Sequence, residues 1–148
     1  MKRFRFELDP LLQKHTWEVA VLRTEKATAS RAVTEQERVL QAIQKEIQDN
    51  YNALVQASAQ DAHINIAQRQ VLAVYLQHQH DLASEAKASL DKVQNVERQI
   101  AEQLLAASQQ VKTLEKLRDT EMKKHEYLRL RAEFNETDEN WLSRHKPA

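Results

Sequence analysis

The residues that most readily break a helix are confined to the two ends of this chain. The sequence of 148 residues contains no glycine, and its prolines are Pro10 and Pro147. Since glycine and proline are the strongest helix breakers, nothing between these positions forces an interruption. Strong helix formers such as Ala, Glu, Lys, Leu and Gln dominate, whereas aromatic residues make up only 5%. The sequence therefore predicts long helices that each bury a narrow stripe.

Apolar residues recur at alternating steps of four and three along the first half of the chain. The positions are Leu8, Leu12, His15, Val19, Leu22, Lys26, Ala29, Val33, Gln36, Leu40, Ile43, Ile47, Asn50 and Leu54. A mean step of about 3.5 residues is typical of a coiled-coil seam. The polar members His15, Lys26, Gln36 and Asn50 weaken such a seam but help to fix its register and its partner.

The second half of the chain repeats the same spacing. The positions are Leu72, Leu76, Gln79, Ala83, Ala86, Leu90, Val93, Glu97, Ile100, Leu104, Ala107, Val111 and Leu114. Between the two seams the pattern fades, and Ser58, Asp61 and Asn65 are the best turn and cap residues there. Two helices joined by a short connection normally pack antiparallel. We therefore expect an all-α fold, a long antiparallel two-helix coiled coil.

The first ten residues, MKRFRFELDP, predict a short extended arm before the first helix. Phe4 and Phe6 alternate with arginines, which is the period of a strand. Asp9 offers a helix cap, and Pro10 suits the first helical position, where its missing N–H is not needed. The expected organisation is one domain, with an arm at 1–9, helices at 10–57 and 66–142, a turn at 58–65 and a tail at 143–148.

Register arithmetic predicts that the second helix outruns the first. If the turn centres near residue 61, Pro10 pairs near residue 112. The second seam also loses its apolar character after Leu114, because its next positions are Arg118, Glu121 and His125. About 25 residues, or roughly 40 Å of helix, should then project as a C-terminal overhang. Its apolar residues are scattered over several faces, which favours a helix surrounded by a partner over a solvated helix end.

Composition excludes several classes of function. The 22 basic and 22 acidic residues balance, which argues against nucleic acid or anionic lipid as the main partner. The chain has no cysteine, and its six histidines show no metal-binding helical spacing. Without glycine there is no phosphate-cradling loop, and a two-helix rod offers no pocket for acid–base catalysis. We expect a non-enzyme without cofactor or metal and, since no apolar run could span a membrane or serve as a secretory signal, a cytoplasmic protein.

Both ends of the chain carry residues that resemble a known family. FRFELDPLLQ at the start and LEKLRDTEMKKHEYLRLRAEFNETDENWLSRH at the end are similar to the flagellar FliJ family and the related injectisome YscO family. The most telling parts are EKL at Glu115–Leu117, KKHEY at Lys123–Tyr127, and the acidic pair Asp138–Glu139 before Trp141. Length, the aromatic and basic start, and the long hairpin fit the same plan over the whole chain.

The resemblance implies a stalk of a type III protein export machine, at the cytoplasmic face of the inner membrane. Such a stalk enters the pore of the export ATPase hexamer, reaches the cytoplasmic domain of the export gate and handles substrate-escort chaperones. The residues expected to bind the ATPase are Phe4, Phe6, Lys116, Arg118, Met122, Lys123, Lys124 and Tyr127. Those expected to bind the gate are Leu72, Tyr75 and Leu76, although ordinary seam packing explains Leu72 and Leu76 equally well.

Two other classes of protein share a long apolar seam. A scaffold or tether uses a coiled coil to space two partners, and a holdase chaperone binds unfolded clients at exposed helix tips. The overhang favours the stalk, since a passive spacer has no need of one unpaired amphipathic helix. The polar seam residues suit an intramolecular hairpin, and hence a monomer, but they leave open a dimer of straight helices. Nothing in the sequence separates a flagellar from an injectisome system.

Overall fold

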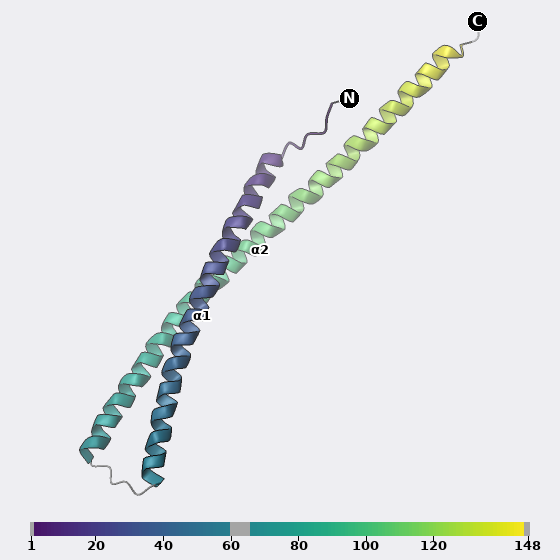
Figure 1. Ribbon diagram of the computed structural model, residues 1–148. Helices are drawn as coiled ribbons and strands as arrows, with labels where there is room; N and C mark the ends of the chain where they lie inside the picture. Colours follow the sequence, from purple (N-terminus) through teal and green to yellow (C-terminus); the bar gives the residue numbers. More distant parts are fainter. Residues whose placement is uncertain (1, 60–65, 147–148) are drawn as a thin grey trace. The chain divides into compact units, whose positions relative to one another are not determined.

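The computed structural model describes residues 2–59 and 66–146, and within these residues the chain forms two helices (Figure 1). Helix α1 spans Asp9–Ala59 and α2 spans Ile66–Arg144, against predicted ranges of 10–57 and 66–142. From residue 60 onward the turn expected at 58–65 lies outside the described residues. The two helices pack against each other, which confirms the predicted all-α helical hairpin.

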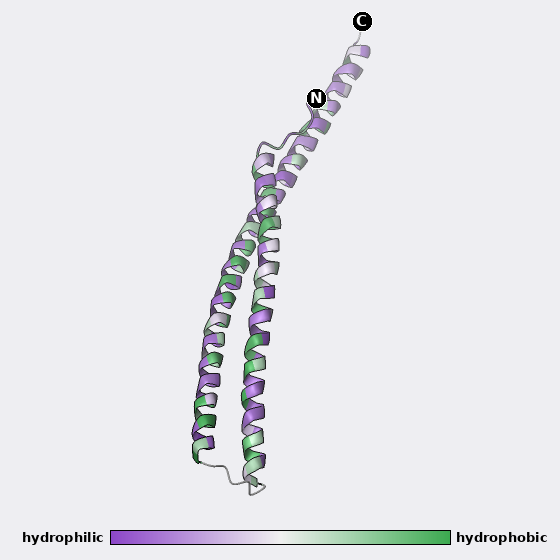
Figure 2. Cartoon of the chain, turned by 60° about the vertical axis from the view of Figure 1, so that its left-hand side comes forward, coloured by the Kyte–Doolittle hydropathy of each residue, from purple (hydrophilic) through white to green (hydrophobic). Residues whose placement is uncertain are grey.

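The chain divides into two compact units, each built from a stretch of both helices. The terminal unit comprises Met1–Val21 and Gln103–Ala148, and the inner unit comprises Leu22–Glu102. Figure 2 shows apolar residues recurring along both helices, whereas the C-terminal end of α2 is largely hydrophilic. We describe each unit by itself.

In the inner unit the predicted seam positions form the contact between the helices. Ala29, Val33 and Ile47 of α1 and Leu76 and Ala86 of α2 are buried. The remaining apolar seam positions of this unit are half-buried, and none of the seam positions here is fully exposed. Since alanine occupies the seam on both helices, the two backbones can approach closely at those levels.

The seam of the inner unit also carries buried amide groups. Gln79 is buried, and its side-chain oxygen has no hydrogen-bond partner within the described residues. The side-chain nitrogen of Asn50, on the other helix, likewise has none there. An unpaired amide group costs free energy when it is buried, so these two side chains weaken the seam. Polar seam positions of this kind contribute to register rather than to stability.

The terminal unit continues the same pattern. Leu12, Val19 and Ala107 are buried, and Leu104 and Val111 are half-buried, whereas Leu8, predicted as the first seam position, is exposed. The chain directions are antiparallel here, because early residues of α1 lie beside late residues of α2. An open groove at this level is lined by Leu11, His15, Ala106, Gln109, Gln110, Thr113 and Leu114.

The start of α1 differs from the prediction by one residue. The backbone N–H of Leu12 donates to the carbonyl of Leu8 at 2.9 Å, so Leu8 takes the capping position. Asp9 is the first helical residue, and its carboxylate accepts a hydrogen bond from Gln13 Nε2 at 3.0 Å. The predicted cap at Asp9 is therefore wrong. Pro10 still lies in the first turn, where its missing N–H leaves no bond unmade, and Asp9 still complements the positive end of the helix dipole.

Candidate interaction surface

The N-terminal arm, residues 2–8, lies against α2 in the terminal unit. Phe6 is buried, with 7% of its surface exposed, and Phe4 is half-buried, whereas Arg3 and Arg5 are exposed. This alternation is the one that the sequence predicts for an extended segment with one apolar face. The arm thus covers α2 with its two aromatic residues and leaves its arginines in solvent.

His125 of α2 contacts the beginning of the arm. Its Nε2 lies 3.1 Å from the backbone carbonyl oxygen of Lys2, and its ring centroid lies 5.5 Å from that of Phe4. The His125 side chain is half-buried, as is that of Arg118 one heptad earlier. Arg118 and His125 follow the seam spacing of α2 beyond Leu114, but because they are not apolar, a search for apolar residues does not detect them. Beyond Leu114 the arm takes the place of α1, and Glu121, the seam position between Arg118 and His125, is exposed.

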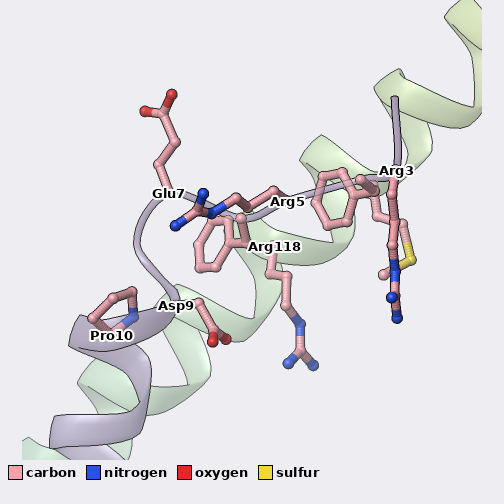
Figure 3. Close-up of a pocket in the computed structure, with 9 residues that line it drawn as sticks. Arg3, Arg5, Glu7, Asp9, Pro10 and Arg118 are labelled. Atoms are coloured by element: carbon pink, nitrogen blue, oxygen red, sulfur yellow. The ribbon is translucent and has the colours of Figure 1, made fainter. Parts of the chain in front are cut away.

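An open hollow of ≈ 950 Å³ lies where the arm meets the start of α1 (Figure 3). It is lined by Arg3, Phe4, Arg5, Phe6, Glu7, Asp9, Pro10, Arg118 and Met122. Figure 3 shows Arg118 rising from α2 beside Asp9. The Nε atom of Arg118 is buried and has no hydrogen-bond partner within the described residues. Of the residues expected to bind an ATPase, Arg118 is thus half-buried beside the arm, and Met122, which is 45% exposed, lines the hollow with it.

The other residues expected to bind an ATPase are exposed. Lys116, Lys123 and Lys124 lie on the surface of α2, and Tyr127 is 64% exposed. A second hollow, lined by arm residues together with Glu121, Lys124, His125 and Leu128, adjoins them. The lysines thus form a basic surface next to the arm, available to an acidic partner.

From residue 126 to Arg144, no described segment buries any residue of α2. Every residue of this stretch, which we call the exposed end, is exposed. It carries large apolar side chains, namely Tyr127, Leu128, Leu130, Phe134, Trp141 and Leu142. The overhang predicted from near residue 112 thus begins at Glu126, because the arm covers the turns before it.

Most of the large apolar residues of the exposed end follow a regular spacing, although the expectation from the sequence is that they are scattered over several faces. Tyr127, Leu130, Phe134 and Trp141 follow steps of three, four and seven, and Thr137 fills the remaining heptad position. We call these five positions the end stripe. Continuing the hairpin seam from His125 instead gives Leu128, Ala132, Asn135, Glu139 and Leu142. Each position of the end stripe lies two residues after the corresponding position of this continued seam. Two residues rotate by about 200° around the helix, so the end stripe lies on the face opposite the seam.

The three residues expected to bind an export gate occupy different environments in the inner unit. Leu76 is buried and Leu72 is half-buried, and both line a hollow of ≈ 310 Å³ with Leu54, Ser58, Arg69 and Ala73. Tyr75 is exposed, and its hydroxyl donates to Glu46 Oε1 at 2.8 Å. This bond raises the pKa of Tyr75, because only the protonated phenol can donate it. Tyr75, with 38% of its surface exposed, is the only one of the three that is exposed rather than packed.

Within the described residues there is no cluster of three or more metal-ligating side chains, and no helix there is long and apolar enough to cross a membrane. The candidate interaction surface comprises the arm, the adjoining lysines and the exposed end of α2. Comparison of the chain with protein-family models, with curated proteins and with solved structures gave no match.

Proposed function

We propose that this protein is the stalk of a type III export apparatus, flagellar or injectisome, that binds the pore of the export ATPase ring and links it to the export gate. The observation that carries the proposal is the exposed end of α2, which remains helical over residues 126–144 although every residue there is exposed. Apolar side chains on opposite faces of a lone helix are suited to a partner that surrounds it. The resemblance of both chain ends to the FliJ and YscO families supports the same function.

The arm supports the proposal by bringing charge to the same region. The exposed Arg3 and Arg5 line a hollow with Lys124 of α2, and the exposed Lys123 adjoins Lys124 in the sequence. We call these four basic residues the basic collar. A basic collar would steer the exposed end toward an acidic pore entrance, and salt would screen that attraction. Apolar contacts deeper in the pore would then supply most of the affinity.

The test is the activity of the cognate export ATPase with and without this protein. We expect the triple variant Lys116→Glu, Lys123→Glu, Lys124→Glu to lose most of the stimulation and of the hexamer assembly. Arg118 and Met122 are left unchanged, because both line the hollow beside the arm. The matched control reverses three exposed lysines of the inner unit, Lys45, Lys87 and Lys92, and should stimulate like the parent.

The apolar part of the proposed contact is tested by Tyr127→Ala, which leaves every charge in place. Because Tyr127 is exposed and lies beyond the arm, circular dichroism should stay unchanged while stimulation falls. Normal stimulation by both this variant and the triple lysine variant would favour the tether instead, in which the exposed end is a solvated helix terminus.

Binding to the gate is tested separately at Tyr75. Tyr75→Ala should weaken binding to the cytoplasmic domain of the export gate, and Tyr75→Phe shows whether the ring or the hydroxyl bond to Glu46 is responsible. Leu72 and Leu76 are poor tests of binding, since they are packed against their neighbours. If Tyr75→Ala binds the gate as the parent does, this surface serves packing alone.

A further inference from the structure

We infer that the exposed end of α2 pairs with the same segment of a second copy of this chain, as an antiparallel two-helix coiled coil formed through the end stripe. The inference does not rest on the proposed function, because it concerns the purified protein alone. It also differs from a dimer of straight helices, since each copy keeps its own hairpin and only the exposed ends meet.

The end stripe has the spacing that a coiled-coil partner requires. Tyr127, Phe134 and Trp141 are seven residues apart, with Leu130 and Thr137 between them, so they occupy the a and d positions of a heptad. Leu130 is 50% exposed, Phe134 74% and Trp141 59%, and no described segment covers them. Since α2 is already helical through Arg144, pairing needs no folding of the segment and little loss of backbone entropy.

Charges beside the end stripe select an antiparallel partner. Arg131 follows the d position Leu130, and Asp138 follows the d position Thr137, so both flank the stripe on the same side. In an antiparallel pair these positions face each other, which places Arg131 of each copy near Asp138 of the other. In a parallel pair Glu133 would instead face Asp138 of the second copy and repel it, while Glu126 would face and attract Arg131. These charges give the parallel pair no net gain, whereas the antiparallel pair gains two attractions.

The same charges select a register. When Leu130 of one copy faces Trp141 of the other, Phe134 faces Thr137, and Arg131 lies near the partner's Asp138. If the pairing is shifted by one heptad toward the N-terminus, Arg131 of one copy lies near Arg131 of the other, and Glu133 lies near Glu133 of the other. Both contacts are repulsive, so the first register is favoured. Within the described residues neither Arg131 nor Asp138 has an ion pair in its own chain, so both are available.

The test measures self-association of the full-length protein by sedimentation equilibrium over a range of concentrations. We expect a weak monomer–dimer equilibrium. Leu130→Lys, in the end stripe, should raise the dissociation constant at least about tenfold, because it buries a charge at a paired position. Leu128→Lys is the matched control, since Leu128 is 53% exposed but lies on the opposite face, and it should change the constant less than about threefold.

Charge reversal tests the predicted contact between Arg131 and Asp138. Arg131→Asp alone places two aspartates together and should weaken the dimer, whereas the exchange Arg131→Asp with Asp138→Arg restores opposite charges in an antiparallel pair and should recover the parent constant. Added salt should weaken the parent dimer and leave the Arg131→Asp variant less affected or strengthened. Helix content is expected to stay the same in all these variants.

Three outcomes would overturn the inference. The first is a parent protein that remains monomeric at the highest soluble concentration. The second is an equal effect of Leu128→Lys and Leu130→Lys, which would indicate non-specific apolar association. The third is an exchange variant that stays as weak as Arg131→Asp, which would exclude the antiparallel register. None of these outcomes bears on stimulation of an ATPase.

Discussion

Two consecutive stretches of α2 are equally helical but differ in what covers them. In residues 118–125, which we call the covered stretch, Arg118 and His125 are half-buried beside the arm with its buried Phe6 and half-buried Phe4. Every residue of the exposed end, by contrast, is exposed. Helical structure therefore does not depend on a tertiary partner here. Elongating an existing helix avoids the cost of nucleation, so favourable propensity is enough to carry α2 to Arg144.

The comparison separates local from tertiary stabilisation. In the exposed end, side chains interact within the helix. Arg129 and Glu133 approach to 3.9 Å, and Thr137 Oγ1 donates to the Glu133 carbonyl at 2.8 Å. In the covered stretch, by contrast, the interactions reach to the arm, as between His125 and the Lys2 carbonyl. Substitutions in the covered stretch and the arm should therefore change the free energy of unfolding far more than substitutions in the exposed end.

The largest effect is expected from Phe6→Ala. Removing this buried ring should lower the free energy of unfolding by about 2–3 kcal/mol. This loss is smaller than for most buried phenylalanines, because the hollow beside Phe6 is open to water. Chemical denaturation followed by circular dichroism measures the change. The exposed neighbour provides the control, since Arg5→Ala should change stability by less than about 0.5 kcal/mol. Equal effects of the two variants would mean that the arm does not cover α2 in solution.

A smaller effect of opposite sign is expected from Arg118→Leu. The buried Nε atom of Arg118 has no partner within the described residues, so an apolar side chain at this seam position should raise the free energy of unfolding by about 1 kcal/mol. Arg131→Leu makes the same chemical change in the exposed end and should leave the stability of dilute protein unchanged. A loss of stability in Arg118→Leu would show that its guanidinium is satisfied, for example by water in the hollow.

Phe134→Ala should change stability by no more than about 0.5 kcal/mol, although it removes as large a ring as Phe6→Ala does. Phe134 is 74% exposed, so its ring gains little from the folded state. The measurement requires dilute protein, in which the proposed dimer has dissociated. A loss comparable to that of Phe6→Ala under these conditions would reveal a contact of the exposed end within the monomer.

The smallest effect is expected from Glu133→Gln, which removes the attraction to Arg129. Both side chains are largely exposed, so the loss should be about 0.3 kcal/mol at low salt and should vanish at high salt. Thermal melts at two ionic strengths measure it. A larger or salt-independent loss would indicate a role of Glu133 beyond this pair.

Much of the fold follows from the sequence, because period and composition point to the same structure. The steps of four and three place Leu12, Val19 and Ala107 in the core of the terminal unit, and all three are buried. The alternation of Phe4 and Phe6 with arginines likewise predicts which face of the arm is covered. Both patterns depend only on backbone geometry, which is the same for every helix or extended segment.

The covered stretch could not be predicted in the same way, because residue type hides its position in the seam. Arg118 and His125 occupy seam positions, yet a pattern based on apolar residues ends before them. Their partner is a seven-residue arm rather than a helix, so the level at which it packs is set by aromatic contacts that the spacing of α2 does not reveal. The end stripe has the same heptad spacing as the seam of α2, but it is offset by two residues and so lies on the opposite face. Extending the seam along the sequence therefore does not find it, although the spacing itself is visible there.

The pairing of an extended arm with a helix has a consequence for insertions and deletions. Two residues of extended chain advance by about 6.6 Å, close to the 5.4 Å of one helical turn, so Phe4 and Phe6 can reach successive turns of α2. Loss of a single residue between Phe6 and α1 would turn the aromatic face away and present arginine to the helix. Loss of two residues would keep that face but move it by about one turn. Length changes in the arm should thus be tolerated in pairs, whereas those within the paired helices should preserve the heptad.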